Sequence, residues 1–154
     1  MNTMSKREFN ERESKEIQEF NQSVITEFRA NNGVVGGPFT QVPLLLLTTT
    51  GRKTGLERVN PLAYLSEGGR IIIIASFAGA PVNPPWYYNL LANPEDIVEI
   101  GSERFTARAT VLNEPERTGM FNKVAALMPQ FNDYQRKTSR VIPVIALTRV
   151  TQSP

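Results

Sequence analysis

Neither cysteine nor histidine occurs among the 154 residues of this chain. The absence of cysteine excludes disulfide bonds, thiolate zinc sites, iron–sulfur clusters and cysteine nucleophiles. The absence of histidine excludes a Ser-His-Asp triad and removes the commonest metal ligand and the usual general base near neutral pH. Any chemistry of this protein must therefore use hydroxyl, amine, guanidinium or carboxyl groups, or a bound cofactor.

A large charge excess and long apolar runs are also missing. Seventeen Lys and Arg against fifteen Asp and Glu give a net charge of only +2, which does not favour nucleic-acid binding. No apolar run approaches the ~20 residues needed to span a bilayer, and residues 1–19 lack the apolar stretch of a signal peptide. We therefore expect one globular domain over residues 1–154, located in the cytoplasm, and we leave contact with a membrane surface open.

The hydrophobic pattern predicts an α+β fold. Apolar residues recur at steps of three and four over residues 14–31, which predicts an N-terminal helix after a flexible lead-in over residues 1–13. Short apolar or β-branched runs between glycine-rich turns predict about six strands, at residues 42–50, 58–65, 70–76, 97–100, 103–112 and 141–150. Since most connections are hairpins, we expect a small antiparallel barrel with helices packed outside.

Two further helices are expected between these strands. Asn83 is the predicted N-cap of a helix over residues 86–92, because two prolines follow it and proline suits the first turn. Asn113 with Glu116 resembles a capping box and predicts a helix that runs to about residue 128. Residues 131–140 are expected to form a short helix or a loop.

The densest basic feature is the turn over residues 51–55, Gly-Arg-Lys-Thr-Gly, with Arg58 just beyond it. Cations and free backbone N–H groups that converge at one turn are suited to binding phosphate or carboxylate groups. The turn joins two strands and does not have the spacing of a P-loop. A solvated hairpin tip is the alternative, and the spacing alone leaves both open.

A second unusual segment, residues 76–89, holds the only tryptophan, Trp86, and two of the four tyrosines. Its small residues would let a flat ring approach the backbone N–H groups around Ser76–Gly79, with Trp86 as a wall. The alternative is that Trp86 packs in the core, as aromatic side chains usually do.

Taken together, these segments resemble the deazaflavin (coenzyme F420)-dependent nitroreductase and F420H2-dependent quinone reductase family, within the split β-barrel flavin-binding superfamily. The resemblance covers roughly residues 20–150. The matching stretches are Phe28-Arg29-Ala30-Asn31, Gly37, residues 44–55, Arg58, Asn60-Pro61-Leu62, Ser76, Gly79, Asn83-Pro84, Trp86-Tyr87, Asn89-Leu90, Ala92-Asn93-Pro94, Tyr134-Gln135, Thr138 and Arg140.

The resemblance implies a small split β-barrel that binds coenzyme F420, with the reduced form as hydride donor to a quinone, an unsaturated lactone or another enone, or a nitroaromatic compound. It implies that Arg52, Lys53 and Arg58 hold the phosphate and the acidic tail. It further implies ring, hydroxyl or backbone contacts at Thr50, Thr54, Pro61, Leu62, Ser76, Phe77, Ala78, Gly79, Trp86 and Asn89. Asn89 is expected either to contact the cofactor or to support residues that do.

The resemblance also suggests how the reaction ends. Ser76 and Tyr134 are the candidate catalytic donors to the substrate oxygen on which negative charge builds. The final proton is expected from Tyr134 or from water, and we favour water. Two departures concern the substrate side: Phe77 stands where several relatives have a basic residue, and the late tyrosine-rich segment is reduced to Phe131 and Tyr134.

Several alternatives stay open at this point. Tyr134 is equally interpretable as a surface tyrosine, and the cluster Arg136, Lys137 and Arg140 as a solvated face or an extension of the tail site. The apolar face of the first helix suits packing on the barrel better than a membrane. Rival functions are an FMN or haem protein of the same fold, a non-catalytic F420 carrier, and a nucleic-acid-binding barrel, which the aliphatic strands disfavour. A monomer and a homodimer are both expected forms.

Overall fold

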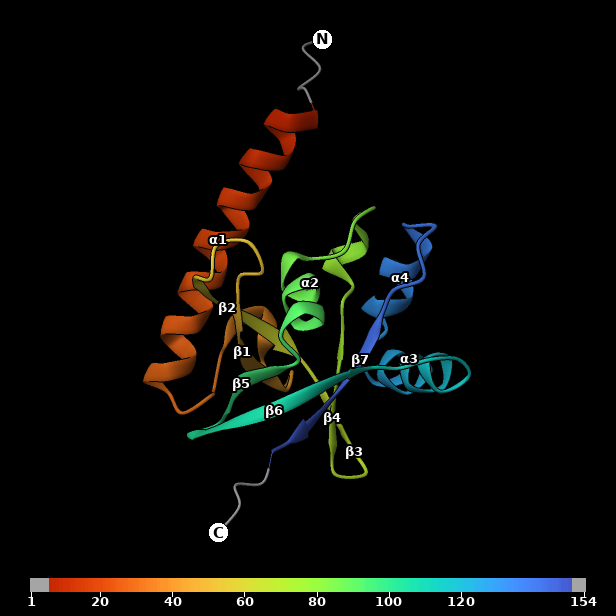
Figure 1. The fold of residues 1–154 in the computed structure, drawn as a ribbon. Helices are drawn as coiled ribbons and strands as arrows, with labels where there is room; N and C mark the ends of the chain where they lie inside the picture. Colours follow the sequence, from red (N-terminus) through yellow and green to blue (C-terminus); the bar gives the residue numbers. More distant parts are fainter. Residues whose placement is uncertain (1–5, 151–154) are drawn as a thin grey trace.

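The computed structural model describes the backbone of residues 6–150 and the side chains of residues 15–150. Seven strands form one antiparallel sheet in the order β2-β1-β5-β6-β7-β4-β3. Their bounds are β1 Leu44–Thr50, β2 Glu57–Ala63, β3 Leu65–Glu67, β4 Arg70–Ile74, β5 Glu95–Ile100, β6 Glu103–Val111 and β7 Val144–Arg149. The sheet curls into a half-barrel (Figure 1).

The two edge strands explain the curl. β2 and β3 lie at opposite edges of the sheet, yet only Tyr64 separates them along the chain. The two edges must therefore approach one another, which bends the sheet into a barrel. The predicted antiparallel α+β barrel is confirmed, with seven strands instead of six, since the chain forms a further short strand, β3, after Tyr64.

Helices and short 3-10 turns surround this sheet. Their bounds are α1 Lys6–Ala30, η1 Gly37–Phe39, η2 Phe77–Gly79, α2 Pro85–Ala92, α3 Glu116–Leu127 and α4 Gln130–Arg136. Among the residues that the structure describes, no helix combines the length and hydropathy that crossing a bilayer requires.

The strand alternation divides the core between two faces of β1. Leu44 and Leu46 face α1 and pack with Val24, Ile25 and Phe28 of that helix. Leu45 and Leu47 face the barrel interior, where they pack with Trp86 of α2 and with residues of the other strands. A third cluster lies where α3 and α4 cover β4 and β7. The C-terminal part of the apolar face of α1 is thus buried on the barrel, whereas Phe20 on the same helix is 50% exposed.

Several predicted helix boundaries need correction. α1 already begins at Lys6, so residues 6–13 of the predicted lead-in are helical, and residues 1–5 lie outside the described residues. Asn83 does not cap α2, because Pro84 takes that position and the Asn83 amide bonds other side chains. The segment after residue 130 forms a helix, α4.

The predicted capping box of α3 is also absent. The helix begins at Glu116 with Pro115 at the N-cap, and the carboxylate of Glu114 accepts hydrogen bonds from the backbone N–H and the hydroxyl of Thr118. These bonds lower the pKa of Glu114. Glu114, and not Asn113, therefore provides the side-chain acceptor for a backbone N–H in the first turn of α3.

Candidate functional site

The basic turn between β1 and β2 is a compact hydrogen-bonded loop. The Gly51 N–H donates to the Leu56 carbonyl at 2.7 Å, and the Gly55 N–H donates to the Gly51 carbonyl at 2.8 Å. The Thr54 hydroxyl accepts from the Leu56 N–H at 3.2 Å. Gly55 has a φ of +71°, a conformation that glycine adopts without strain. The loop thereby projects the side chains of residues 52 and 53 outward.

The cations of this turn make no ion pair within the described part of the chain. Arg52, Lys53 and Arg58 are exposed, and none makes an ion pair. The Arg52 guanidinium lies over the Tyr88 ring, 4.8 Å from its centroid. Several other arginines are paired with a carboxylate, as in Arg149–Glu103 at 2.7 Å. Three unpaired cations at one turn can bind an anion such as a phosphate.

Asn89 of α2 fixes this turn from below. Its side-chain carbonyl accepts the Arg52 backbone N–H at 3.1 Å, and its amide donates to the Thr49 hydroxyl at 3.0 Å. Asn89 is buried, so these bonds form away from water. Of the two roles expected for Asn89, the geometry favours support of the turn.

Asp96 of β5, which no sequence pattern singles out, lies beneath the same turn. The register that pairs Thr48 with Ile97 brings Asp96 opposite Thr49 on the barrel-interior face. Its carboxyl is buried, its Oδ2 atom lacks a hydrogen-bond partner, and burial raises its pKa to about 6, while the Thr50 backbone N–H lowers it. A single Asp in a short strand has no sequence signal that separates it from an exposed one.

The loop after β4 has a backbone that favours anion binding. Ser76 is right-handed, whereas Phe77 and Ala78 have φ values of +48° and +52°. Successive residues of opposite hand turn their N–H groups toward one point, a nest that binds an anionic or carbonyl oxygen. Left-handed conformations of residues other than glycine are strained and concentrate at functional sites.

Three N–H groups of this nest are free. No described residue accepts the N–H of Ser76, Phe77 or Ala78, whereas the Gly79 N–H donates to the Ser76 carbonyl at 3.0 Å. Gly79, which has a φ of +80°, therefore shapes the loop and does not offer its N–H to a ligand. The nest consists of the backbone N–H groups of Ser76, Phe77 and Ala78.

Two side-chain donors near this loop reach the surface. Asp96 Oδ2 is the only fully buried side-chain polar atom without a partner in the described chain. The Ser76 hydroxyl and the Trp86 indole N–H also lack partners, so both must be open to the surface although their residues are buried. Trp86 thus packs in the core, and its N–H remains free to meet a ligand.

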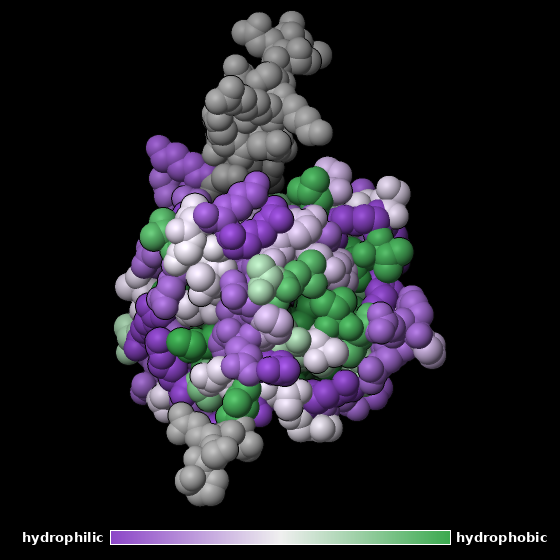
Figure 2. Space-filling view, viewed as in Figure 1, coloured by the Kyte–Doolittle hydropathy of each residue, from purple (hydrophilic) through white to green (hydrophobic). Residues whose placement is uncertain are grey.

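Pro61 and Leu62 of β2 stand opposite Leu46 and Leu45 of β1. Leu62 packs against the interior cluster that contains Trp86, so the predicted wall residues Leu62 and Trp86 share one part of the barrel. Pro61 lies in an edge strand, where its missing N–H costs no ladder hydrogen bond. Figure 2 shows an apolar area between α2 and α4 bordered by hydrophilic residues.

Tyr134 is half-buried and packs its ring edge-to-face on Phe131, with the ring centroids 5.7 Å apart. Its backbone carbonyl lies against Gly79 of the nest loop. No described residue hydrogen-bonds its hydroxyl. The helix α4 therefore touches the loop, while the Tyr134 ring packs on the cluster under α3 and α4.

The predicted basic cluster does not form one face. Arg136 is exposed and paired with Asp133 at 2.6 Å, and Lys137 lies near the Tyr134 ring. Arg140 turns inward and donates to the nest loop. Arg140 is therefore neither part of a solvated charged face nor free to extend the tail site.

Comparison with known proteins decides the family. The family model described as F420H(2)-dependent quinone reductase matches residues 21–149. The chain belongs to this family. It is 38% identical over 126 residues to an F420H(2)-dependent quinone reductase of Mycobacterium tuberculosis (strain H37Rv), a match that covers 79% of this chain and 85% of the relative.

Solved structures agree with this membership. An F420-H2 dependent reductase (FDR-A) is 37% identical with a TM-score of 0.63, covering 68% of this chain and 93% of that one. A domain-swapped dimer is 32% identical with a TM-score of 0.64, covering 87% and 98%. The haem storage protein HutZ of Vibrio cholerae, 13% identical with a TM-score of 0.56 over 86% of this chain and 92% of its own, shares the fold alone. The predicted resemblance to F420H(2)-dependent quinone reductases is confirmed.

Proposed function

We propose that this protein is an F420H2-dependent reductase that reduces a small electron-poor acceptor, with quinones as the first acceptor class. Family membership supports the reaction class. The observation that carries the assignment of the site is the basic turn of Arg52, Lys53 and Arg58, which lacks an ion-paired countercharge within the described residues. A cofactor with a phosphate and an acidic tail supplies that charge.

The described residues fit such a cofactor. Arg52, Lys53 and Arg58 would hold the phosphate and tail carboxylates, with Thr50 at the end of β1 and Thr54 on the turn itself. The nest offers three N–H donors for a ring carbonyl oxygen, next to the hydroxyl of Ser76. The aliphatic and aromatic walls would come from Leu62 and Trp86, whereas Pro61 pairs with Leu46 on the opposite face of the sheet, toward α1. When bound, the reduced deazaflavin supplies a hydride.

The protein residues act on charge and protons. A quinone that gains a hydride and then a proton becomes a hydroquinone, and negative charge builds on its oxygen before the proton arrives. The free Ser76 hydroxyl is the donor that we assign to that oxygen. We assign delivery of the proton to water at the surface-open loop. Tyr134 is the second candidate donor.

The proposal assigns residues of one chain and leaves both a monomer and a homodimer as expected forms. The acceptor is a small molecule, and nothing in the proposed site serves a nucleic acid. The cytoplasmic location and any contact with a membrane surface stay predictions.

The test is a fluorescence and absorbance titration of the protein with oxidised F420, FMN and FAD at low and high salt. We expect F420 alone to bind, with an affinity that falls as salt screens the turn. The double variant Arg52→Ala/Lys53→Ala should bind F420 at least about tenfold more weakly, because two charge-assisted contacts are lost.

Preference for FMN or FAD would overturn the cofactor assignment. The reaction is tested separately by following oxidation of F420H2 with and without a soluble quinone. Tight F420 binding without any acceleration of quinone reduction would instead identify a carrier of the cofactor.

A further inference from the structure

Arg140 lies beyond α4, and its guanidinium donates to the loop that follows β4. Nε donates to the Ala80 carbonyl at 2.8 Å, and Nη2 donates to the Ser76 carbonyl. Nη1 donates to the Ala75 carbonyl at 3.1 Å and to Asn83 Oδ1 at 2.8 Å. One side chain thus binds the backbone on both sides of the two left-handed residues.

This bonding leaves the guanidinium little capacity for a ligand. Four of its five N–H groups are in use, and no described carboxylate pairs with it. Burial lowers the pKa of Arg140, and the nearby Tyr88 raises it. A guanidinium stays protonated nevertheless, so an uncompensated positive charge lies directly behind the nest.

The nest conformation needs such a restraint. Phe77 and Ala78 hold positive φ values that strain any residue other than glycine, and such a backbone persists only where the surroundings fix it. The loop's own hydrogen bonds are two, from Gly79 to Ser76 and from Ala80 to Phe77, each at 3.0 Å. The carbonyls of Ser76 and Ala80 are held by Arg140.

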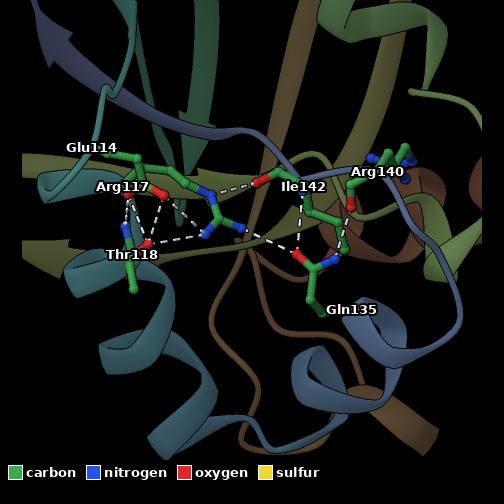
Figure 3. A network of polar contacts seen from close by, with 6 residues as sticks. All are labelled: Glu114, Arg117, Thr118, Gln135, Arg140 and Ile142. Atoms are coloured by element: carbon green, nitrogen blue, oxygen red, sulfur yellow. Dashed lines mark hydrogen bonds and ion pairs between the residues drawn. The ribbon is translucent and has the colours of Figure 1, made fainter.

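Arg140 is itself held in place by α3 and α4 (Figure 3). The Gln135 amide donates to the Arg140 carbonyl at 2.8 Å, and its Oε1 accepts from Arg117 at 3.1 Å and from the Ile142 N–H at 3.2 Å. Arg117 also donates to the Ile142 carbonyl at 3.0 Å. These bonds hold the backbone around Arg140 in place independently of the bonds that its side chain makes to the loop.

We propose that Arg140 is a positioning residue that holds Ser76–Ala78 in the conformation whose three free N–H groups bind a negatively charged or carbonyl oxygen of the cofactor or acceptor. The inference rests on the proposed function for the identity of that oxygen. The restraint on the loop itself depends only on this chain.

The first test follows hydrogen exchange of the free protein. In Arg140→Met and Arg140→Lys, the amides of Gly79 and Ala80 should exchange at least about tenfold faster than in the unmodified protein, because the strained loop opens. Arg136→Met, which removes an exposed cation of α4 near the same site, is the matched control and should leave both rates unchanged. Lysine retains the charge but cannot reproduce the fork of donors.

The second test adds oxidised F420. Arg140→Lys should still bind the cofactor in a salt-sensitive way through the basic turn, while the absorbance shift of the bound ring is reduced and kcat falls at least about tenfold with a smaller change in the KM for F420H2.

Exchange rates at Gly79 and Ala80 that are unchanged in both variants would overturn the proposal, and so would unfolding of both, since that would make Arg140 a general stability residue. If the unmodified protein binds no F420 but the loop opens as expected, the proposed function fails and the restraint by Arg140 stands.

Discussion

At the scale of single residues, Asp96 is buried and one of its carboxyl oxygens accepts no hydrogen bond from the described residues. The residue is 6% exposed, and its Oδ2 has no partner among the described residues. Its pKa is raised from 3.8 to about 6, first by burial. Between these values the folded chain binds a proton that the unfolded chain has released, so stability falls as the pH rises through this window.

We therefore expect Asp96→Asn to stabilise the protein at about pH 8 by roughly 1–3 kcal/mol, because an amide removes the buried unpaired charge. The gain should shrink as the pH falls below about 6, where Asp96 itself becomes neutral. Urea unfolding across this pH range measures it. Asp133→Asn, at an exposed carboxylate paired with Arg136, is the control and should change stability by less than about 1 kcal/mol. A gain that does not depend on pH would contradict the assignment.

The residues that were predictable share a local signal. Arg52 and Lys53 stand in a glycine-bounded turn, and the turn is exposed and unpaired as such a pattern indicates. Asp96 and the inward turn of Arg140 had no such signal, because both depend on partners more than 40 positions away, such as Thr50 for the first and Ala80 for the second.

At the scale of elements, the contact between η2 and α4 depends on Gly79. A Cβ atom at this position would lie 2.8 Å from the Tyr134 carbonyl oxygen and 2.9 Å from Lys137 Cβ. Gly69, in the turn before β4, has the same φ of +80° but has open space around it. Alanine substitutions at Gly69 and Gly79 therefore separate two losses of folding free energy. Both substitutions strain the left-handed backbone, but only the one at Gly79 also disturbs the contact with α4.

We expect Gly69→Ala to lower the free energy of unfolding by about 1 kcal/mol, the cost of a left-handed alanine. Gly79→Ala should lower it by roughly 1–3 kcal/mol more, because η2 and α4 must separate. Urea denaturation of both variants gives the comparison. Equal losses of unfolding free energy in the two variants would show that α4 moves away without cost and does not hold the loop in place.

The order of the elements was predictable from periodicity, whereas their ends were not. The hairpins followed the glycine-rich turns, as at residues 51–55 and 101–102. The two predicted helix N-caps were wrong. The Asn83 side chain accepts a hydrogen bond from Arg140 and does not cap α2, and the Glu114 carboxylate accepts the Thr118 N–H in the first turn of α3. Such tertiary competition for a side chain is invisible to local pattern.

At the scale of the whole molecule, the distribution of charge matters more than its total of +2. Most carboxylates near the sheet surface pair with an arginine, as in Arg70–Glu116 and Arg108–Glu95, each at 2.9 Å. Among the described residues, the basic turn has no such partner. The affinity for a polyanionic ligand should therefore depend on where the positive charges lie on the molecule and not only on their number.

Two triple variants of equal charge test this. One replaces Arg52, Lys53 and Arg58 by Gln, and the other replaces Arg70, Arg108 and Arg149, so each removes three positive charges. Exposed ion pairs contribute at most about 1 kcal/mol each, so the second variant should fold and bind F420 within about threefold of the unmodified protein. The first should lose at least about 100-fold in affinity through faster dissociation, since its direct contacts disappear, while association slows modestly in both.

Stopped-flow fluorescence at two salt concentrations resolves the rates of association and dissociation. Equal losses of affinity in the two variants would mean that net charge alone attracts the cofactor and that the turn is not its binding site.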